Sequence, residues 1–409
     1  MRRPPPIASV VAACAALSGA GCGESSHVED DAHGDVVVGN DGARREVLAA
    51  IGANVVAPLL EAFEARARTL DAALTALATA EAAGESAAGA ELDAARAAWH
   101  AAMDTWQEAE LFQLGPAAAM GTSPGGVDLR DRIYSWPIVN PCRVDQETVK
   151  GLSDPAALTD APFNVRGLAA LEVLLFDPDR DNACPPQSTI NTDGSWAALR
   201  DEDIRRRRAE YGVAVAGDLL ASARALVAAW SPSGGDFLGE LREAGQRDVY
   251  PSAQAGLNAL SDALFYLEKE VKDMKVAMPL GLRECATDVC PQLVESRFAA
   301  RSARNVLHNA RAFQRGFLGG EPGGVELGVD DLLTAVGASD VASDMATKIA
   351  AAIVAIEAMT DPLEELLVTD EARVQAAYDA VKAVTDLLRT DVVTVLDLEL
   401  PERVEGDND

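Results

Sequence analysis

Hydrophobic residues recur every three or four positions along most of the chain, which is the spacing of one face of an α-helix. The stretches that show this pattern are residues 44–83, 90–114, 203–230, 257–274 and 291–317, followed by two more helices around Ile349 and Val381. Runs of alternating β-branched residues, which are typical of half-buried strands, are nearly absent. The many Ala, Leu, Glu and Arg residues also favour helix. We therefore predict an all-α protein.

The stretch Arg166–Asp177 differs from the others because it is apolar almost all round, which predicts a buried helix. One carboxylate, Glu172, lies in its middle. A buried charge is costly unless it is paired, bound to a metal or neutralised. Two interpretations stay open: a structural ion pair or hydrogen-bonded acid, and a functional carboxylate, since perturbed acids gather at functional sites.

The chain offers one clean domain boundary, the turn-forming segment Ser231-Pro-Ser-Gly-Gly235. We predict two packed helical-bundle domains, residues 46–230 and 236–400, followed by an acidic tail, 401–409, that frays. Residues 115–165 are rich in Gly, Pro, Ser and Asn. A long loop of this kind in a domain is usually functional or pinned in place.

The N-terminus has the features of a targeting segment. Arg2 and Arg3 precede an apolar stretch, and small residues lead to Cys22, as in a bacterial lipoprotein signal. We predict a signal peptide over 1–21, lipid on Cys22, an acidic flexible tether over 22–45, and residence at the periplasmic face of the outer membrane. The lipid is then the only membrane attachment. An ordinary secretory signal is the alternative.

The charge balance limits the choice of partners. The chain has 409 residues, with 35 Lys and Arg against 65 Asp and Glu, and a net charge of −30. This balance argues against nucleic acid and against an anionic membrane surface. Export permits disulfides. We predict the pairs Cys142–Cys184, which flanks the central helix, and Cys285–Cys290, which closes a short loop.

Several segments together resemble the imelysin family. They are residues 99–115, Arg132-Ile-Tyr-Ser-Trp-Pro137, Gly167–Phe176, Pro279–Gly281, Phe317–Gly320 and the ending from Leu388. The resemblance implies two packed helical bundles and a bacterial envelope location. The family includes an insulin-cleaving membrane protease and relatives tied to iron acquisition. Its signature, Gly-x-His-x-x-Glu, falls on Gly167, Ala169 and Glu172, so the histidine is replaced here.

The missing histidine changes the expected chemistry. Helix positions three apart share a face, so the family's His and Glu could hold one metal together. A zinc site needs three or four protein or water ligands. Only His100 and His308 remain in the folded region. We therefore expect no cofactor and leave the peptidase activity of the family unassigned, with a carboxylate-bound divalent metal or iron as the alternative.

Three functions follow from these residues and from the resemblance. The first is a non-catalytic envelope lipoprotein, monomeric, that binds a small ligand or an envelope protein in the cleft between its bundles. The others are a metal-dependent peptidase and a structural protein whose site has decayed. The expected site residues are Glu172 and Gly167, with Arg132, Trp136 and Asp128 from the preceding loop. An arginine beside Glu172 would lower the pKa of its carboxyl group.

Overall fold

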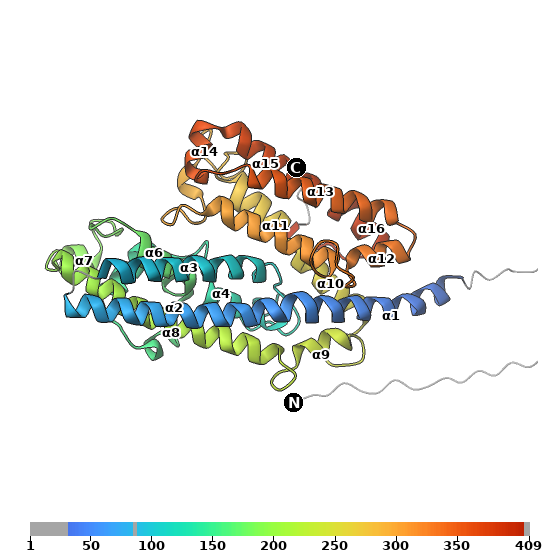
Figure 1. Cartoon of the computed structure of the whole chain (residues 1–409), viewed down its shortest axis with the longest axis horizontal. Helices are drawn as coiled ribbons and strands as arrows, with labels where there is room; N and C mark the ends of the chain where they lie inside the picture. Colours follow the sequence, from blue (N-terminus) through green and yellow to red (C-terminus); the bar gives the residue numbers. More distant parts are fainter. Residues whose placement is uncertain (1–31, 85–87, 405–409) are drawn as a thin grey trace, which may run out of the picture. The chain divides into compact units, whose positions relative to one another are not determined.

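The longest helices of the N-terminal half lie against one another. The computed structural model describes residues 32–84 and 88–404. Helix α1 (Ala32–Ile51) continues through a π-helical turn (Gly52–Val56) into α2 (Ala57–Ala83), and α2 packs against both α3 (Ala88–Ala109) and α8 (Asp201–Trp230) (Figure 1). The stripe from Leu59 to Leu77 on α2 is buried, as its spacing predicts.

The segment between α3 and α8 is not the plain loop that its composition suggests. It contains α4 (Leu129–Ile133), α5 (Pro141–Lys150), α6 (Gly167–Phe176), α7 (Thr189–Thr192) and three 3₁₀ turns (Gly115–Ala117, Pro155–Leu158 and Phe163–Val165). The predicted disulfide Cys142–Cys184 is confirmed and ties the start of α5 to the segment after α6. Cys285–Cys290 is confirmed as well.

Helix α6 is the buried central helix that the sequence predicts. Its residues from Gly167 to Leu175 are all buried. Gly167 has a φ of 73°, and a Cβ atom there would lie 2.5 Å from the carbonyl oxygen of Ile133, so only glycine fits. The indole of Trp99 donates to the carbonyl oxygen of Leu168 at 2.9 Å, which fixes α6 against α3.

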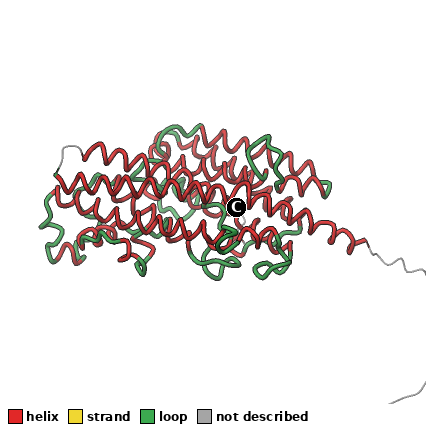
Figure 2. The backbone as a smooth tube through the Cα atoms, turned by 60° about the horizontal axis from the view of Figure 1, so that its bottom comes forward, coloured by secondary structure: helices red, strands yellow, loops and turns green. Residues whose placement is uncertain are grey.

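The C-terminal half is also helical. Its elements are α9 (Phe237–Arg242), α10 (Ala253–Leu264), a π-helix (Leu267–Ala277), α11 (Ser302–Leu318), α12 (Val329–Ala335), α13 (Ser339–Glu357), α14 (Leu363–Thr369), α15 (Glu371–Leu387), a π-helical turn (Leu388–Val392) and α16 (Val393–Leu396), with 3₁₀ turns at Pro291–Leu293 and Glu402–Val404. Figure 2 shows no strand in the described part of the chain, which confirms the all-α prediction.

Both halves of the chain share one hydrophobic core. Trp106 and Phe112 from one side of Ser231–Gly235 and Phe265 and Phe313 from the other belong to the same cluster of buried side chains. Helix α11 packs on α3 as well as on α13. Residues Asn40–Asp409 form one compact unit. A division into domains at 46–230 and 236–400 stays a prediction.

The helical structure begins earlier than the sequence suggests. Helix α1 starts at Ala32, inside the segment 22–45 that we expected to be a flexible tether. Its C-terminal end is anchored because Val47, Leu48 and Ile51 are buried in the core. Arg44 also donates to Asp41 at 3.0 Å within the helix. The expected signal peptide, Cys22, the rest of the tether and residues 405–409 of the tail lie outside the described residues.

Among residues 32–84 and 88–404, two helical stretches are long and apolar enough to cross a membrane by length and composition, Asp41–Ala83 and α8. About half of each apolar window, 50% and 56%, is buried inside the protein. Helices α2 and α8 pack against each other. Core packing therefore accounts for their apolar character.

Two departures from the predicted helices change which polar groups face the core. The stripe expected over 257–274 runs into π-helical backbone at Leu267, so Met274 is only half-buried and Lys275 is fully buried. The helix expected from residue 291 starts at Ser302 instead. Phe298 and Ala299 therefore keep backbone N–H groups that a helix interior would have used.

Candidate functional site

The carboxylate of Glu172 is held by backbone from the other half of the chain. One oxygen, Oε1, accepts hydrogen bonds from the backbone N–H groups of Phe298 and Ala299, both at 3.1 Å. The side chain of Ser296 also hydrogen-bonds to it. Glu172 is 4% exposed. Its carboxylate therefore fixes the segment that leads into α11.

Burial dominates the acidity of Glu172. It raises the pKa of the carboxyl group to about 7, the two backbone hydrogen bonds lower it in part, and the nearby charge of Glu295 raises it. The groups that set this pKa are therefore the burial itself, the backbone of Phe298 and Ala299, and the side chains of Ser296 and Glu295, and the suggested arginine partner is not among them. At neutral pH the group is poised between its protonated and ionised forms.

The other expected site residues lie apart from these hydrogen bonds. Gly167 is beside the backbone of Arg132 and Ile133. The positive charge of the Arg132 side chain instead favours the ionised form of Asp218, against the effect of burial. Asp128 accepts from the backbone N–H of Met120 at 2.7 Å. Trp136 is buried, and its ring centroid lies 5.6 Å from Nζ of Lys275. Only Trp136 thus joins a polar cluster in the core.

Lys275 is the centre of that cluster. It is fully buried and forms an ion pair with Glu295 at 2.9 Å. Its Nζ also donates to Gln107 at 2.7 Å and to Asn309 at 2.9 Å. Tyr134 donates to Glu295 at 2.7 Å. These five residues, the Lys275 cluster, connect α3, α11 and the segment before α6, so a buried charge is compensated by groups from both halves.

A second buried carboxylate, Glu110, lies beside the Lys275 cluster. Arg130 pairs with it at 2.9 Å, and the hydroxyl of Tyr266 donates to it. Burial, together with the charge of Glu110, raises the pKa of Tyr266 well above its usual value, so the phenol stays protonated as a donor. Glu110, Arg130 and Tyr266 thus extend the Lys275 cluster into a longer run of buried polar contacts, which we call the polar seam.

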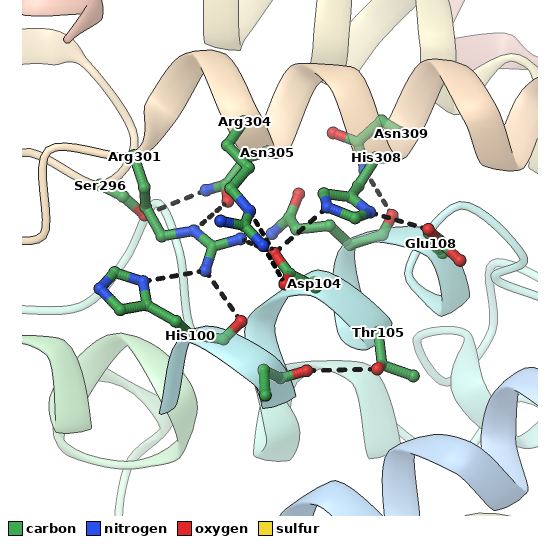
Figure 3. Close-up of polar contacts among 12 residues, drawn as sticks. His100, Asp104, Thr105, Glu108, Ser296, Arg301, Arg304, Asn305, His308 and Asn309 are labelled. Atoms are coloured by element: carbon green, nitrogen blue, oxygen red, sulfur yellow. Dashed lines mark hydrogen bonds and ion pairs between the residues drawn. The ribbon is translucent and has the colours of Figure 1, made fainter. Parts of the chain in front are cut away.

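The seam continues to the surface between α3 and α11 (Figure 3). Asp104 on α3 accepts from Arg301 at 2.8 Å and from Arg304 at 2.7 Å. His308 lies between Asp104 at 3.2 Å and Glu108 at 2.7 Å. Burial alone would lower the pKa of His308, but hydrogen bonds to the two carboxylates outweigh it and raise that pKa.

His100 lies next to Arg301 at the same surface. Nη1 of Arg301 is 3.2 Å from Nδ1 of His100 and donates to the His100 carbonyl oxygen at 3.0 Å. Burial, together with the charge of Arg301, lowers the pKa of His100 to about 4. The imidazole is neutral at pH 7. Because arginine only donates, Nδ1 accepts and Nε2 carries the proton.

Four of these residues, His100, Asp104, Arg301 and Arg304, line a groove of about 550 Å³. Its walls come from α3, from the start of α11 and from the connection between α13 and α14, and they are Ala97, His100, Ala101, Asp104, Ala299, Ala300, Arg301, Ala303, Arg304, Met359, Thr360, Asp361 and Pro362. Ala299 is also one of the two residues whose N–H binds Glu172. The carboxylate of the signature therefore lies directly behind one wall of the groove. We call this space the α3–α11 groove.

The donor set around Glu172 does not fit a catalytic zinc ion. Ala169 offers no ligand atom, and Oε1 of Glu172 is occupied by two N–H groups. Within residues 32–84 and 88–404, no group of three or more His, Cys, Asp and Glu side chains is placed to hold a metal ion. His100 and His308 point into the arginine and carboxylate contacts described above instead.

Several of these residues have no distinct signal in the sequence. Lys275 and Glu295 carry no motif, and the π-helix that buries Lys275 has no clear signal in the periodicity. Asn305 and Asn309 do mark a polar patch on the predicted helix. That patch is a true signal, because both side chains are buried and bonded to this seam. Its partners on α3 lie about two hundred residues earlier.

The described part of the chain is thus all-α, with a buried glutamate on a central helix and a polar groove beside it. A family model described as Imelysin matches residues 57–390. The chain therefore belongs to the imelysin family, as its sequence suggests. It is 26% identical over 318 residues to iron-regulated protein A of Synechococcus elongatus, covering 75% of this chain and 76% of that protein.

Two solved structures share the fold. One, described as an iron-regulated protein A precursor from Parabacteroides distasonis, has a TM-score of 0.64 at 19% identity and covers 87% of this chain and 95% of its own. The other, an imelysin-like protein from Psychrobacter arcticum, has a TM-score of 0.63 at 17% identity and covers 87% and 96%. These likenesses agree with the all-α architecture.

Proposed function

We propose that this protein is a non-catalytic envelope lipoprotein that binds a ligand in the α3–α11 groove. The observation that carries the proposal is the groove itself, a space of about 550 Å³ lined by His100, Asp104, Arg301 and Arg304. Ligand sites are usually concave and hold a few convergent polar groups. The signature carboxylate, Glu172, supports the wall of the groove rather than a metal ion.

The same observations weigh against the alternatives. A peptidase would need the histidine that Ala169 replaces, and the ligands left around Glu172 do not make a zinc site. A purely structural protein would have no need for a groove lined by charged groups next to the signature helix. A relative named iron-regulated protein A supports a link to iron. We therefore propose that the protein binds its ligand as part of iron acquisition.

A groove-filling substitution tests the function. Ala97 lines the groove and is exposed, so Ala97→Trp fills the space without disturbing the core. Ala94 is equally exposed on α3 but lies outside the groove, and Ala94→Trp is the matched control. In a thermal-shift screen of small metabolites and iron chelates, we expect at least one compound to raise the Tm of the wild type and of Ala94→Trp but not of Ala97→Trp. Shifts that persist in Ala97→Trp, or no shift with any compound, would contradict the proposal.

The lipid anchor is the second part of the proposal. It is supported by the apolar leader and the small residues before Cys22, and a lipid there would hold the protein at the periplasmic face of the outer membrane. We expect Cys22→Ser to move the protein from the membrane pellet to the soluble fraction in cell fractionation. Cys14→Ser, which changes another cysteine of the leader, is the control and should leave it in the pellet. A Cys22→Ser protein that still pellets with outer membranes would refute the anchor.

A further inference from the structure

We propose that the α3–α11 groove takes a small oxyanion, a carboxylate or a phosphate, bound by Arg304 and His100. This inference rests on the proposed function and names the chemistry of its ligand. It requires free hydrogen-bond donors in the groove, acids that are already engaged by other residues, and room for an organic anion.

Arg304 supplies the first donor. Its Nε and Nη2 atoms both bind Asp104, at 2.7 and 2.5 Å. In the part of the chain that the structure describes, Nη1 has no hydrogen-bond or ion-pair partner. The side chain is 57% exposed and lines the groove. Asp104 thus fixes one edge of the guanidinium group and leaves the other for a ligand, which is the geometry in which arginine binds oxyanions.

His100 supplies the second donor. Its Nδ1 faces Arg301, so the proton of the neutral ring is on Nε2. In Figure 3 the other ring nitrogen points away from Arg301. The ring lines the groove and is half-buried. An oxygen that accepts from Nε2 would bind without competing with the contact that holds Arg301.

The start of α11 also favours an anion in the groove. Ala299, Ala300 and Ala303 line the groove there and present no long side chains. The N–H groups of Ser302–Arg304 begin a helix of 17 residues. Such N–H groups lack partners within their helix, and the helix dipole favours an anion beside them.

The acids that line the groove are already engaged. Asp104 accepts from Arg301 and Arg304 and pairs with His308. Asp361 lies 4.0 Å from Arg373. A cation would meet the arginines, whereas an anion meets uncommitted donors. The groove thus sets two arginines against two aspartates and is close to neutral, whereas the chain as a whole carries −30.

Calorimetric titration with citrate and with inorganic phosphate tests the inference. We expect one of the two anions to bind the wild type, and the stronger binder identifies the ligand as carboxylate or phosphate. Arg304→Gln should weaken that binding by about tenfold or more, since a charge-assisted hydrogen bond is lost. His100→Asn keeps an acceptor for Arg301 and removes the Nε2 donor, so it should also weaken binding. Arg311→Gln is the matched control, because the Arg311 side chain is 44% exposed on α11 and pairs with Glu357 outside the groove.

Two results would overturn the inference. The first is that neither anion binds the folded wild type at millimolar concentration. The second is that an anion binds but Arg304→Gln binds it as tightly as the wild type and Arg311→Gln do. The compound screen with Ala97→Trp separates ligand binding in the groove from the chemical class of the ligand. If a neutral or cationic compound is lost in Ala97→Trp while both anions fail to bind, the function stands and the oxyanion class is wrong. If the screen fails too, both are wrong.

Discussion

Replacing Lys275 with methionine should destabilise the protein by about 3–5 kcal/mol, because it leaves the buried carboxylate of Glu295 without its cation. Lys275 is fully buried, and its ion pair with Glu295 measures 2.9 Å. Three neutral donors, Tyr134, Gln107 and Asn305, remain on Glu295 but cannot neutralise it. Urea unfolding followed by circular dichroism measures the loss.

Two further variants make the Lys275 test specific. Lys348→Met breaks a partly exposed ion pair with Asp344 on α13, and pairs of this kind contribute about 0–1 kcal/mol. We expect it to unfold almost as the wild type does. The double variant Lys275→Met, Glu295→Gln removes both charges and should recover part of the loss. Additive losses in the double variant would mean that the two residues do not act as a pair.

The second large effect depends on pH. Burial raises the pKa of Glu172 in the folded protein to about 7, from its ordinary value of 4.5. The folded state therefore binds this proton more tightly, and the free energy of unfolding falls as pH rises between about 4.5 and 7. At 1.36 kcal/mol for each pKa unit, the full effect is about 3 kcal/mol. Glu172→Gln keeps an oxygen for Phe298 and Ala299 and carries no charge.

We accordingly expect Glu172→Gln to match the wild type near pH 5 and to be more stable than it at pH 8 by up to about 3 kcal/mol. Other titrating groups cancel in this comparison because both proteins contain them. Glu61→Gln, at an exposed position on α2, is the control and should retain the pH dependence of the wild type. A Glu172→Gln variant that is less stable than the wild type at pH 8 would show that the charged form is paired after all.

Much of the fold was predictable because its signals are local. The three-to-four spacing of residues such as Leu70 and Leu74 specifies a buried helix face wherever the helix packs. The almost entirely apolar stretch around Glu172 implied burial, and that is what the structure shows. The cysteine pairs followed from their positions around the central helix and in a short loop.

The surroundings of Glu172 were not predictable in the same way. Its partners, Phe298 and Ala299, are about 126 residues away and contribute backbone atoms, which carry no sequence signature. Arg132 and Asp128 were natural candidates because their loop precedes α6, but that loop approaches α6 through its backbone beside Gly167. Nearness in the sequence therefore predicted that this loop packs against α6, but it did not predict where the loop's side chains point.

The groove posed a further difficulty because three distant segments build it. His100 and Asp104 belong to α3, Arg301 and Arg304 to the start of α11, and Thr360 to a later connection. The α-helical period through residue 291 also predicted the wrong start for α11. The backbone N–H groups of Phe298 and Ala299 donate to Glu172 instead of forming the helix that the local sequence pattern predicts there.

The most direct test of a non-catalytic role is a peptide-hydrolysis assay on the purified mature protein with saturating zinc, run side by side with Glu172→Gln. The signature carboxylate is occupied by backbone N–H groups, and Ala169 stands where the family has histidine. We predict the same background rate for both proteins, with zinc and without it. A zinc-dependent rate in the wild type that Glu172→Gln abolishes would contradict the account and make the protein a peptidase.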